Sequence, residues 1–272
     1  MPDQTDTSRT IFRKTNAALG RHISVTPANS TNRHLSYGRI ILNGQMPRTS
    51  FSNGGQETGL ILLAGAAKVT VDGTPFDLAQ HDGIYIPRDS SIEVSSTGGV
   101  DIAEFSSDVD NRYPLQVVRH AEIARDPSLK FTAGIPTQQR HLNIVLGKNV
   151  DAGRLVAGFT VSEPGNWSSW PPHEHTAMLE EMYVYFNMPD PAFAIQMVYE
   201  NTEYPETVTV VRDGDAVLMP AGYHPNVSCP GHRMSFLWAM AAHREKLDRQ
   251  FGVVNVQPGF GAGGSGLEAS HK

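Results

Sequence analysis

Three histidines and a pair of glutamates give this sequence its clearest chemical signal. His173 and His175 stand one residue apart, the adjacent Glu180 and Glu181 follow, and His224 comes later in the chain. On a β-strand, residues i and i+2 point to the same face, so the first two imidazoles project into one space. Imidazole and carboxylate ligands together suit Zn, Mn, Fe, Ni or Co. The spacing therefore predicts a site for one divalent metal ion inside a β-barrel.

The choice between the two glutamates depends on strand register. Adjacent residues of a strand face opposite sides, so only one of Glu180 and Glu181 can reach the metal. The register of the following EMYVYF segment favours Glu181, although the spacing from the histidines also permits Glu180. We expect the ligand set His173, His175, Glu181 and His224.

Short apolar segments bounded by Gly, Asp and Pro must position these residues. Segments such as LILLAG, GIYIP, MYVYF and AVLMP recur along the 272 residues, which include 25 Gly and 18 Pro. Many short strands at close spacing predict an all-β fold of sandwiches or small barrels. Helical periodicity is weak outside residues 114–126 and 241–251.

An internal repeat divides the chain into two similar parts. HDGIYIPRDSSIEV at residues 81–94 resembles RDGDAVLMPAGYHPNV at residues 212–227, and the segment from Glu57 resembles the segment from Glu181. Two copies of about 100 residues each match the usual size of a domain. We expect an N-terminal barrel in residues 1–115, a linker in 116–140, a metal-binding barrel in 141–243 and a tail in 244–272.

The first copy lacks the predicted ligands. Counted from the shared proline, Ser91 takes the place of His224. Counted back from the glutamate without gaps, Thr49 and Phe51 take the places of the two other histidines. The metal chemistry is therefore expected in the second barrel alone.

Composition and charge narrow the class of protein. The formal net charge is −6 and no basic tract is present, which disfavours nucleic acid or an anionic membrane as a partner. The N-terminus lacks the pattern of a signal peptide, and no apolar run approaches the roughly 18 residues that span a bilayer. The single cysteine excludes an internal disulfide. We expect a soluble cytoplasmic protein that binds a small molecule.

Several motifs in order resemble one enzyme family. GNWSSWPPHEH, LEEMYVYF, the Gln196 and Tyr199 of AIQMVY, VRDGDAVLMPAGYHP and FLWAMAA resemble the 5-deoxy-glucuronate isomerases of inositol catabolism. The segment from Glu181 is also similar to the 5-keto-4-deoxyuronate isomerase of pectin breakdown. The resemblance covers about residues 40 to 243. The tail from His243 and the short loop between His175 and Glu180 depart from the inositol enzymes.

The resemblance implies a bicupin, that is, two tandem cupin barrels of the jelly-roll type. It implies that His173, His175, Glu181 and His224 hold the metal, for which zinc is favoured over Mn, Fe, Ni or Co. The implied reaction is the aldose–ketose conversion of 5-deoxy-glucuronate to 5-dehydro-2-deoxy-gluconate by a homo-oligomer. Alternatives are the pectin-derived ketouronate as substrate, a non-catalytic sugar-binding cupin, and a metal-dependent oxygenase.

An isomerase of this kind also needs a proton carrier close to the metal. Glu180 is a candidate if Glu181 is the ligand, and the others are a metal-bound hydroxide and the phenols of Tyr223 and Tyr199; His224 could serve if it were not a ligand. The residues alone do not rank these groups.

A uronate brings its own carboxylate, which the forked guanidinium of arginine matches with two hydrogen bonds. Arg140, Arg154 and Arg212 are the options, and the resemblance favours Arg140. Trp167, like Trp170 and Trp238, could stack on a sugar face. Gln196 lies in an apolar strand, where a buried amide needs hydrogen-bond partners that a substrate hydroxyl could supply.

Overall fold

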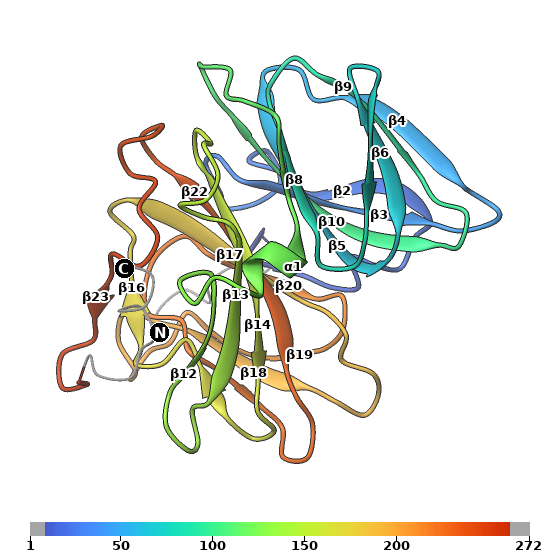
Figure 1. The fold of residues 1–272 in the computed structure, drawn as a ribbon. Helices are drawn as coiled ribbons and strands as arrows, with labels where there is room; N and C mark the ends of the chain where they lie inside the picture. Colours follow the sequence, from blue (N-terminus) through green and yellow to red (C-terminus); the bar gives the residue numbers. More distant parts are fainter. Residues whose placement is uncertain (1–8, 262–272) are drawn as a thin grey trace.

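The computed structural model describes residues 9–261, and its regular structure is almost all strand, which confirms the all-β prediction. No helix in this part of the chain is long and apolar enough to cross a membrane. The first half, in blue to green in Figure 1, contains two sheets. The larger has the order β11-β8-β5-β10-β3-β2 and the smaller β4-β9-β6-β7. Their strands are β2 (Gly20–Val25), β3 (Ser36–Leu42), β4 (Arg48–Ser52), β5 (Gln56–Gly65), β6 (Ala67–Val71), β7 (Thr74–Leu78), β8 (Gly83–Ile86), β9 (Ser91–Ser95), β10 (Val100–Asp108) and β11 (Gln116–Val118).

The second half repeats this arrangement with additions. Its large sheet has the order β1-β20-β17-β22-β14-β13-β12, its smaller sheet the order β15-β21-β18-β19, and β16 pairs with β23. The elements are β1 (Ile11–Phe12), α1 (His120–Ile123), β12 (Lys130–Ala133), β13 (Arg140–Leu146), β14 (Leu155–Ser162), β15 (Trp167–Ser168), β16 (His173–Glu174), β17 (Leu179–Tyr185), β18 (Ala194–Val198), β19 (Thr207–Val211), β20 (Ala216–Met219), β21 (Asn226–Ser228), β22 (Ser235–Ala242) and β23 (Asn255–Val256).

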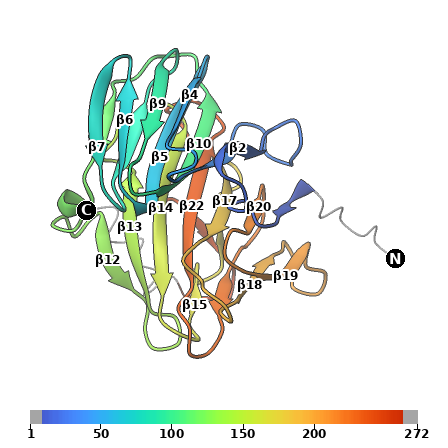
Figure 2. The same cartoon turned by 90° about the vertical axis from the view of Figure 1, so that its right-hand side faces the viewer.

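The two large sheets pack against each other at the centre of the molecule (Figure 2), and each smaller sheet covers an outer face. The burial of β5 shows the consequence. Ile61 and Leu63 belong to the core shared with the second half, whereas Leu60 and Leu62 belong to the core under the smaller sheet. Because both faces of this strand are buried, its sequence is a continuous apolar run rather than an alternation.

Some strands lie in a different half of the molecule from the one that the predicted domain boundaries gave them. β1, at the start of the chain, pairs with β20 of the second half. The expected linker at residues 116–140 contains β11, which pairs with β8 of the first half, and β12, which pairs with β13 of the second half. The helical periodicity of residues 114–126 corresponds only to the four-residue α1, and residues 241–251 form no helix.

The two halves have the same strand pairing, but their equivalent residues are shifted by one position from those that the sequence repeat indicated. Thr58 of β5 pairs with Ile86, and Glu181 of β17 pairs with Met219, in each case the residue before a proline. Thr58 therefore occupies the position of Glu181, which the sequence alignment had given to Glu57. That alignment was wrong, because a shift of one residue moves every side chain to the opposite face of the sheet.

The corrected register leaves the first half without metal ligands. Counted back from Thr58 with the spacing of the second half, the positions of the two paired histidines fall on Ser50 and Ser52 of β4. Ser91 still takes the position of the third histidine. Hydroxyl groups in place of imidazoles and a carboxylate do not make a site for a transition metal.

The register also identifies Glu57 and Glu180 as equivalent residues, and both lie at the contact between the two halves. The Glu57 carboxylate accepts hydrogen bonds from the backbone N–H groups of Gly153, Arg154 and Leu155 at 2.7, 2.6 and 2.8 Å. Both glutamates are buried, with at most 1% of their surface exposed. We call them the interface carboxylates.

Glu180 makes the reciprocal contact from the second half to the first. Its oxygens accept hydrogen bonds from the backbone N–H groups of Arg33, His34 and Leu35 at 2.8, 2.8 and 2.7 Å. Each half thus contributes one carboxylate to three consecutive N–H groups of the other. Hydrogen bonds to an ionised acceptor are among the stronger ones in proteins, so these contacts fix the relative position of the large sheets.

The contact between the halves also contains His81, whose lowered pKa predicts that the stability of the protein depends on pH. The His81 ring lies 4.7 Å from that of Phe159 and 5.2 Å from that of His120. Burial, and then the charges of His120 and Lys130, lower the pKa of His81 from 6.5 to about 4. Between these values the unfolded chain takes up the proton more readily than the folded protein. The contribution of His81 to stability is therefore present above pH 6.5 and is lost as the pH falls towards 4.

Replacing His81 with asparagine is expected to make the free energy of unfolding less sensitive to pH in this window. Asparagine tolerates the positive φ of 71° at this position better than most residues. Urea unfolding of both proteins at neutral pH and at about pH 5 gives the two differences. If His81→Asn loses as much stability on acidification as the wild type, His81 is not the group responsible.

Candidate metal centre

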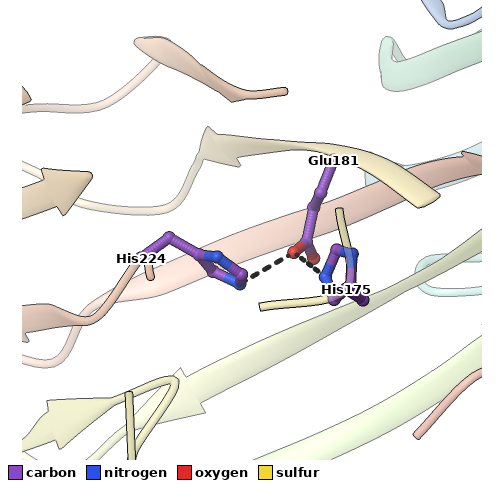
Figure 3. A group of neighbouring side chains, drawn as sticks. All are labelled: His175, Glu181 and His224. Carbon is purple, nitrogen blue, oxygen red and sulfur yellow. Dashed lines mark hydrogen bonds and ion pairs between the residues drawn. The ribbon is translucent and has the colours of Figure 1, made fainter. Parts of the chain in front are cut away.

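His175, Glu181 and His224 form a buried group in the second half (Figure 3). The Nε2 atoms of both histidines lie 3.0 Å from the same carboxylate oxygen, Oε2 of Glu181. One potential ligand atom from each residue falls within 4.8 Å of the others. Three of the four side chains predicted as ligands are therefore gathered at one point.

Three separate segments deliver these side chains. Glu181 is the third residue of β17, His175 directly follows β16, and His224 lies in the connection between β20 and β21. The turn after His175 is closed by hydrogen bonds from the N–H groups of Met178 and Leu179 to its carbonyl oxygen. This short turn brings His175 back over the beginning of the strand that carries Glu181.

His173, the fourth predicted ligand, lies beside this group. Its ring centroid is 5.0 Å from that of His224 and 6.4 Å from that of His175. It is not one of the three residues whose ligand atoms lie within 4.8 Å of one another. The structure thus gives a compact triad with a fourth imidazole in its immediate surroundings.

The three imidazoles are oriented in the same way. In each of them Nδ1 lies within hydrogen-bond distance of a backbone carbonyl oxygen, which can only accept. The distances are 2.8 Å from His173 to Pro171, 3.1 Å from His175 to Leu179 and 3.0 Å from His224 to Gly222. Each Nδ1 therefore carries a proton, and in the neutral ring Nε2 is left with a lone pair. Histidines that bind metals are typically oriented by a contact of this kind.

The surroundings of Glu181 fit a cation at this point. Two Nε2 lone pairs directed at a carboxylate oxygen repel it unless a proton or a metal ion lies between them. The buried Nε2 of His224 makes no hydrogen bond of acceptable geometry, although it lies 3.0 Å from Glu181. Imidazole nitrogens and one carboxylate are also a common donor set for zinc and related ions. The residues present therefore fit a divalent metal.

Burial and neighbouring groups give Glu181 and His173 the protonation states that metal binding needs. Burial alone would raise the pKa of Glu181, but the two imidazoles close to its carboxylate lower it to about 2. Burial and then His224 lower the pKa of His173 to about 3. Burial would lower the pKa of His175 as well, but the hydrogen bond and charge of Glu181 raise it. Near neutral pH, Glu181 is ionised and His173 is neutral.

A cavity of about 460 Å³, including space open to solvent, adjoins the group on the inner side of the large sheet. Its wall includes Glu181 and His173, with Arg140, Trp170 and Tyr183 near them. Two of the four predicted metal ligands, Glu181 and His173, therefore lie in the wall of this cavity.

Tyr183 is a cavity residue that the sequence analysis did not single out. Its hydroxyl group lies 2.6 Å from Ser169 Oγ, and its ring lies 5.8 Å from that of His224. Burial, followed by the charge of Glu181, raises the pKa of Tyr183 well above its usual value. The strand alternation that selected Glu181 could have found this residue, because Tyr183 is two positions further along β17.

Glu180 is placed away from this cavity. Because it neighbours Glu181 on a strand, its side chain points to the opposite face, where both oxygens bind backbone N–H groups of the first half. This placement argues against the predicted role of Glu180 as a proton carrier.

Tyr199 and Tyr223, the two phenols predicted as proton carriers, lie next to each other and not in the cavity wall. Their backbones form an isolated bridge, and the Tyr199 hydroxyl group donates to Gln257 Oε1 at 2.8 Å. Neither residue is part of the described cavity wall. Their spacing in the sequence could not reveal this, because the Gln257 partner comes from the tail.

Gln196, predicted to contact the substrate, finds its partners within the protein. Its Oε1 accepts from the Tyr185 hydroxyl group at 2.5 Å, and its Nε2 donates to the carbonyl oxygens of Met197 and His224 at 2.8 and 3.1 Å. The expectation that a substrate hydroxyl satisfies this amide is therefore corrected. Gln196 instead helps to position the backbone of His224.

The structure places some of the predicted tryptophan and arginine residues at the cavity and others away from it. Trp167 does not line the cavity, but its ring lies 5.2 Å from that of Trp170, which does. Arg140 is in the cavity wall and 4% exposed. Arg154 binds the carbonyl oxygens at the end of β22, and Arg212 lies 6.0 Å from a phenylalanine ring centroid. Of the three arginines, Arg140 is the one at the site.

Comparison with known proteins adds an independent line of evidence. The model of the KduI/IolB family matches residues 11–253. The 5-deoxy-glucuronate isomerase of Geobacillus kaustophilus is 27% identical over 240 residues, which are 82% of this chain and 84% of the relative. The 4-deoxy-L-threo-5-hexosulose-uronate ketol-isomerase of Caldicellulosiruptor bescii is 27% identical over 197 residues, 70% and 68% of the two chains.

Two solved structures show that the fold is shared more widely. An IolB-like protein of Salmonella typhimurium superposes with a TM-score of 0.81 at 21% identity, over 91% of this chain and 96% of that one. An oxalate decarboxylase of Bacillus subtilis gives a TM-score of 0.63 at 13% identity, over 88% and 79%. At these identities the likeness concerns the fold alone.

Proposed function

We infer the function from one premise, that the chain belongs to the KduI/IolB family. The chain is an isomerase, and we propose that it converts 5-deoxy-glucuronate to 5-dehydro-2-deoxy-gluconate, as its similarity to enzymes named 5-deoxy-glucuronate isomerase suggests. The ketouronate of the ketol-isomerase relative is the alternative substrate. Both reactions interconvert an aldose and a ketose.

We further propose that each half is a cupin barrel, so that the chain is a bicupin. The repeated strand pairing and the pairing of one large with one small sheet in each half support this proposal. Homo-oligomer formation and a cytoplasmic location stay predictions from the resemblance.

One observation carries the proposal of metal dependence. Three imidazoles with Nδ1 bound to backbone carbonyls surround an ionised glutamate in a buried group. His175, Glu181 and His224 would hold the ion, with His173 as the fourth ligand, and zinc is favoured over Mn, Fe, Ni or Co. Bound there, a divalent ion supplies a Lewis acid that polarises the substrate carbonyl and favours removal of a proton from the adjacent carbon.

The remaining cavity residues would bind and orient the sugar acid. Arg140 brings a buried positive charge to the wall and is suited to the substrate carboxylate. Tyr183, whose pKa is raised by burial, keeps its proton and can donate a hydrogen bond to a substrate oxygen. Trp170 and Trp238 offer apolar surfaces to the carbon skeleton.

The test combines metal analysis with assays on both uronates. We expect about one divalent ion per purified chain, isomerisation of 5-deoxy-glucuronate in preference to the ketouronate, and loss of activity on chelation that added metal restores. Full activity of metal-free protein would refute the metal dependence. Binding of both acids without turnover would favour the sugar-binding alternative.

Replacing Arg140 with lysine is expected to raise KM for the uronate by about tenfold, which corresponds to about 1.4 kcal/mol. Lysine keeps the charge but loses the guanidinium, whose Nη1 and Nη2 donate to Gln138 O and Trp170 O at 3.0 and 2.6 Å and so hold the positive charge in the cavity wall. The control ligand is a sugar of the same length without the carboxylate, tested as an inhibitor. If Arg140→Lys weakens the acid and the neutral sugar equally, Arg140 does not recognise the carboxylate.

A further inference from the structure

The C-terminal segment, residues 244–260, packs against the half that carries the candidate metal site. Its strand β23 pairs with β16 (Figure 1). In this pairing Val256 stands opposite His173. Beyond this strand, the N–H of Gln257 donates to Pro172 O at 2.9 Å. The Phe260 ring then lies edge-on at 5.2 Å from the ring of Trp170. This end of the segment is thus attached to residues beside the metal centre.

The other end of the segment is attached to β14 and to the turn before it. Arg249 Nε donates to Leu155 O at 2.7 Å, and its Nη2 donates to Gly147 O at 2.9 Å. The preceding turn is held by the ion pair between Arg244 and Asp248 at 2.6 Å. Any residue between Arg249 and β23 is therefore fixed from both sides.

Phe251 is the residue that these attachments place over the cavity. Its ring stacks on Trp238 with a centroid distance of 4.9 Å and an interplanar angle of 16°. Phe251 lines the cavity beside Glu181 and also a second cavity of about 540 Å³, including space open to solvent, whose wall includes Ser128, Lys148 and Arg249. The ring is thus part of the wall between two spaces, one beside the metal ligands and one lined by two cationic residues.

We propose that Phe251 is a specificity-determining residue that limits the site to a single sugar acid. This inference rests on the proposed function of the metal cavity. With the ring present, a second sugar unit attached to the bound acid meets the stacked Phe251 and Trp238. Without it, the two cavities that share Phe251 in their walls would join, and Lys148 in the wall of the second cavity would offer a positive charge to the carboxylate of a second uronate.

The experiment compares binding of D-galacturonate and its dimer, digalacturonate, to the zinc-loaded full chain by calorimetry. We expect the wild type to bind the monomer at least about tenfold more tightly than the dimer, a difference of about 1.4 kcal/mol. Phe251→Ala should reduce this ratio by at least about tenfold. Phe251→Leu, which keeps most of the bulk, should give an intermediate ratio and serves in place of the alanine variant if that variant does not fold.

Val253→Ala is the matched control, because Val253 belongs to the same segment, is 40% exposed and lines neither cavity. It should leave the ratio unchanged. An unchanged ratio in both Phe251 variants, an equal change in Val253→Ala, or failure of the wild type to bind either acid overturns the proposal. Absence of isomerase activity on either uronate would count against the proposed function. The proposal on Phe251 is tested separately by the binding ratio, because calorimetry needs no turnover.

Discussion

Replacing His224 with alanine is expected to empty the metal centre and to remove the isomerase activity. The variant loses one of the two imidazoles that lie 3.0 Å from Glu181 Oε2. Changes to groups around a metal ligand already weaken binding by about 10-fold to 100-fold, so loss of a ligand should cost at least about 100-fold. Loss of the Lewis acid removes several kcal/mol of transition-state stabilisation, which corresponds to a rate lower by about a thousandfold or more.

Elemental analysis and the uronate assay on the same preparation measure both effects. His141→Ala is the matched control, because the His141 side chain is 35% exposed and its Nε2 contacts Glu163 outside the cavity. It should keep the metal content and activity of the wild type. A His224→Ala protein that retains one tightly bound ion per chain and full activity would show that this group is not the metal centre.

The site was predictable from the sequence where strand geometry alone decides the outcome. The spacing of His173 and His175 and the alternation along β17 were enough to nominate Glu181 over Glu180. Tyr183 follows from the same alternation and was overlooked. By contrast, the carbonyl partners of the imidazole Nδ1 atoms are backbone groups within a few residues, and their contact depends on turn conformation that residue types do not specify.

Contacts between segments that are far apart in the sequence could not be predicted either. Gln196 was recognised as a buried amide in need of partners, but those partners include the backbone of His224, which strand pairing brings near. The tail was set apart for its unusual sequence, yet no pattern in it shows that Phe251 stacks on Trp238. The all-β class depended only on local periodicity and composition, whereas the packing of the two large sheets depends on long-range register.

The second large effect is expected on the free energy of unfolding, from replacing either of the interface carboxylates, Glu57 and Glu180. Replacing Glu57 or Glu180 with glutamine is expected to lower the free energy of unfolding by about 3 kcal/mol in either case, because a buried charge-assisted hydrogen-bond set loses one of its acceptors. The amide NH₂ of glutamine also faces backbone N–H donors. Glu57 accepts a further hydrogen bond from the Tyr85 hydroxyl group at 2.6 Å, so its replacement should cost at least as much as that of Glu180. Urea unfolding of metal-free proteins measures both values.

Metal binding should separate the two variants. Glu180 precedes Glu181 on β17, so its contact with Arg33, His34 and Leu35 fixes the strand position from which the ligand projects. Loss of that contact should weaken metal binding by about tenfold, as for other changes behind a ligand. Glu57 has the same kind of contact, but its neighbour is Thr58, so Glu57→Gln should lose stability and keep its metal affinity. Equal metal affinities in two equally destabilised variants would show that the first half supports the fold of the second without positioning its metal ligand.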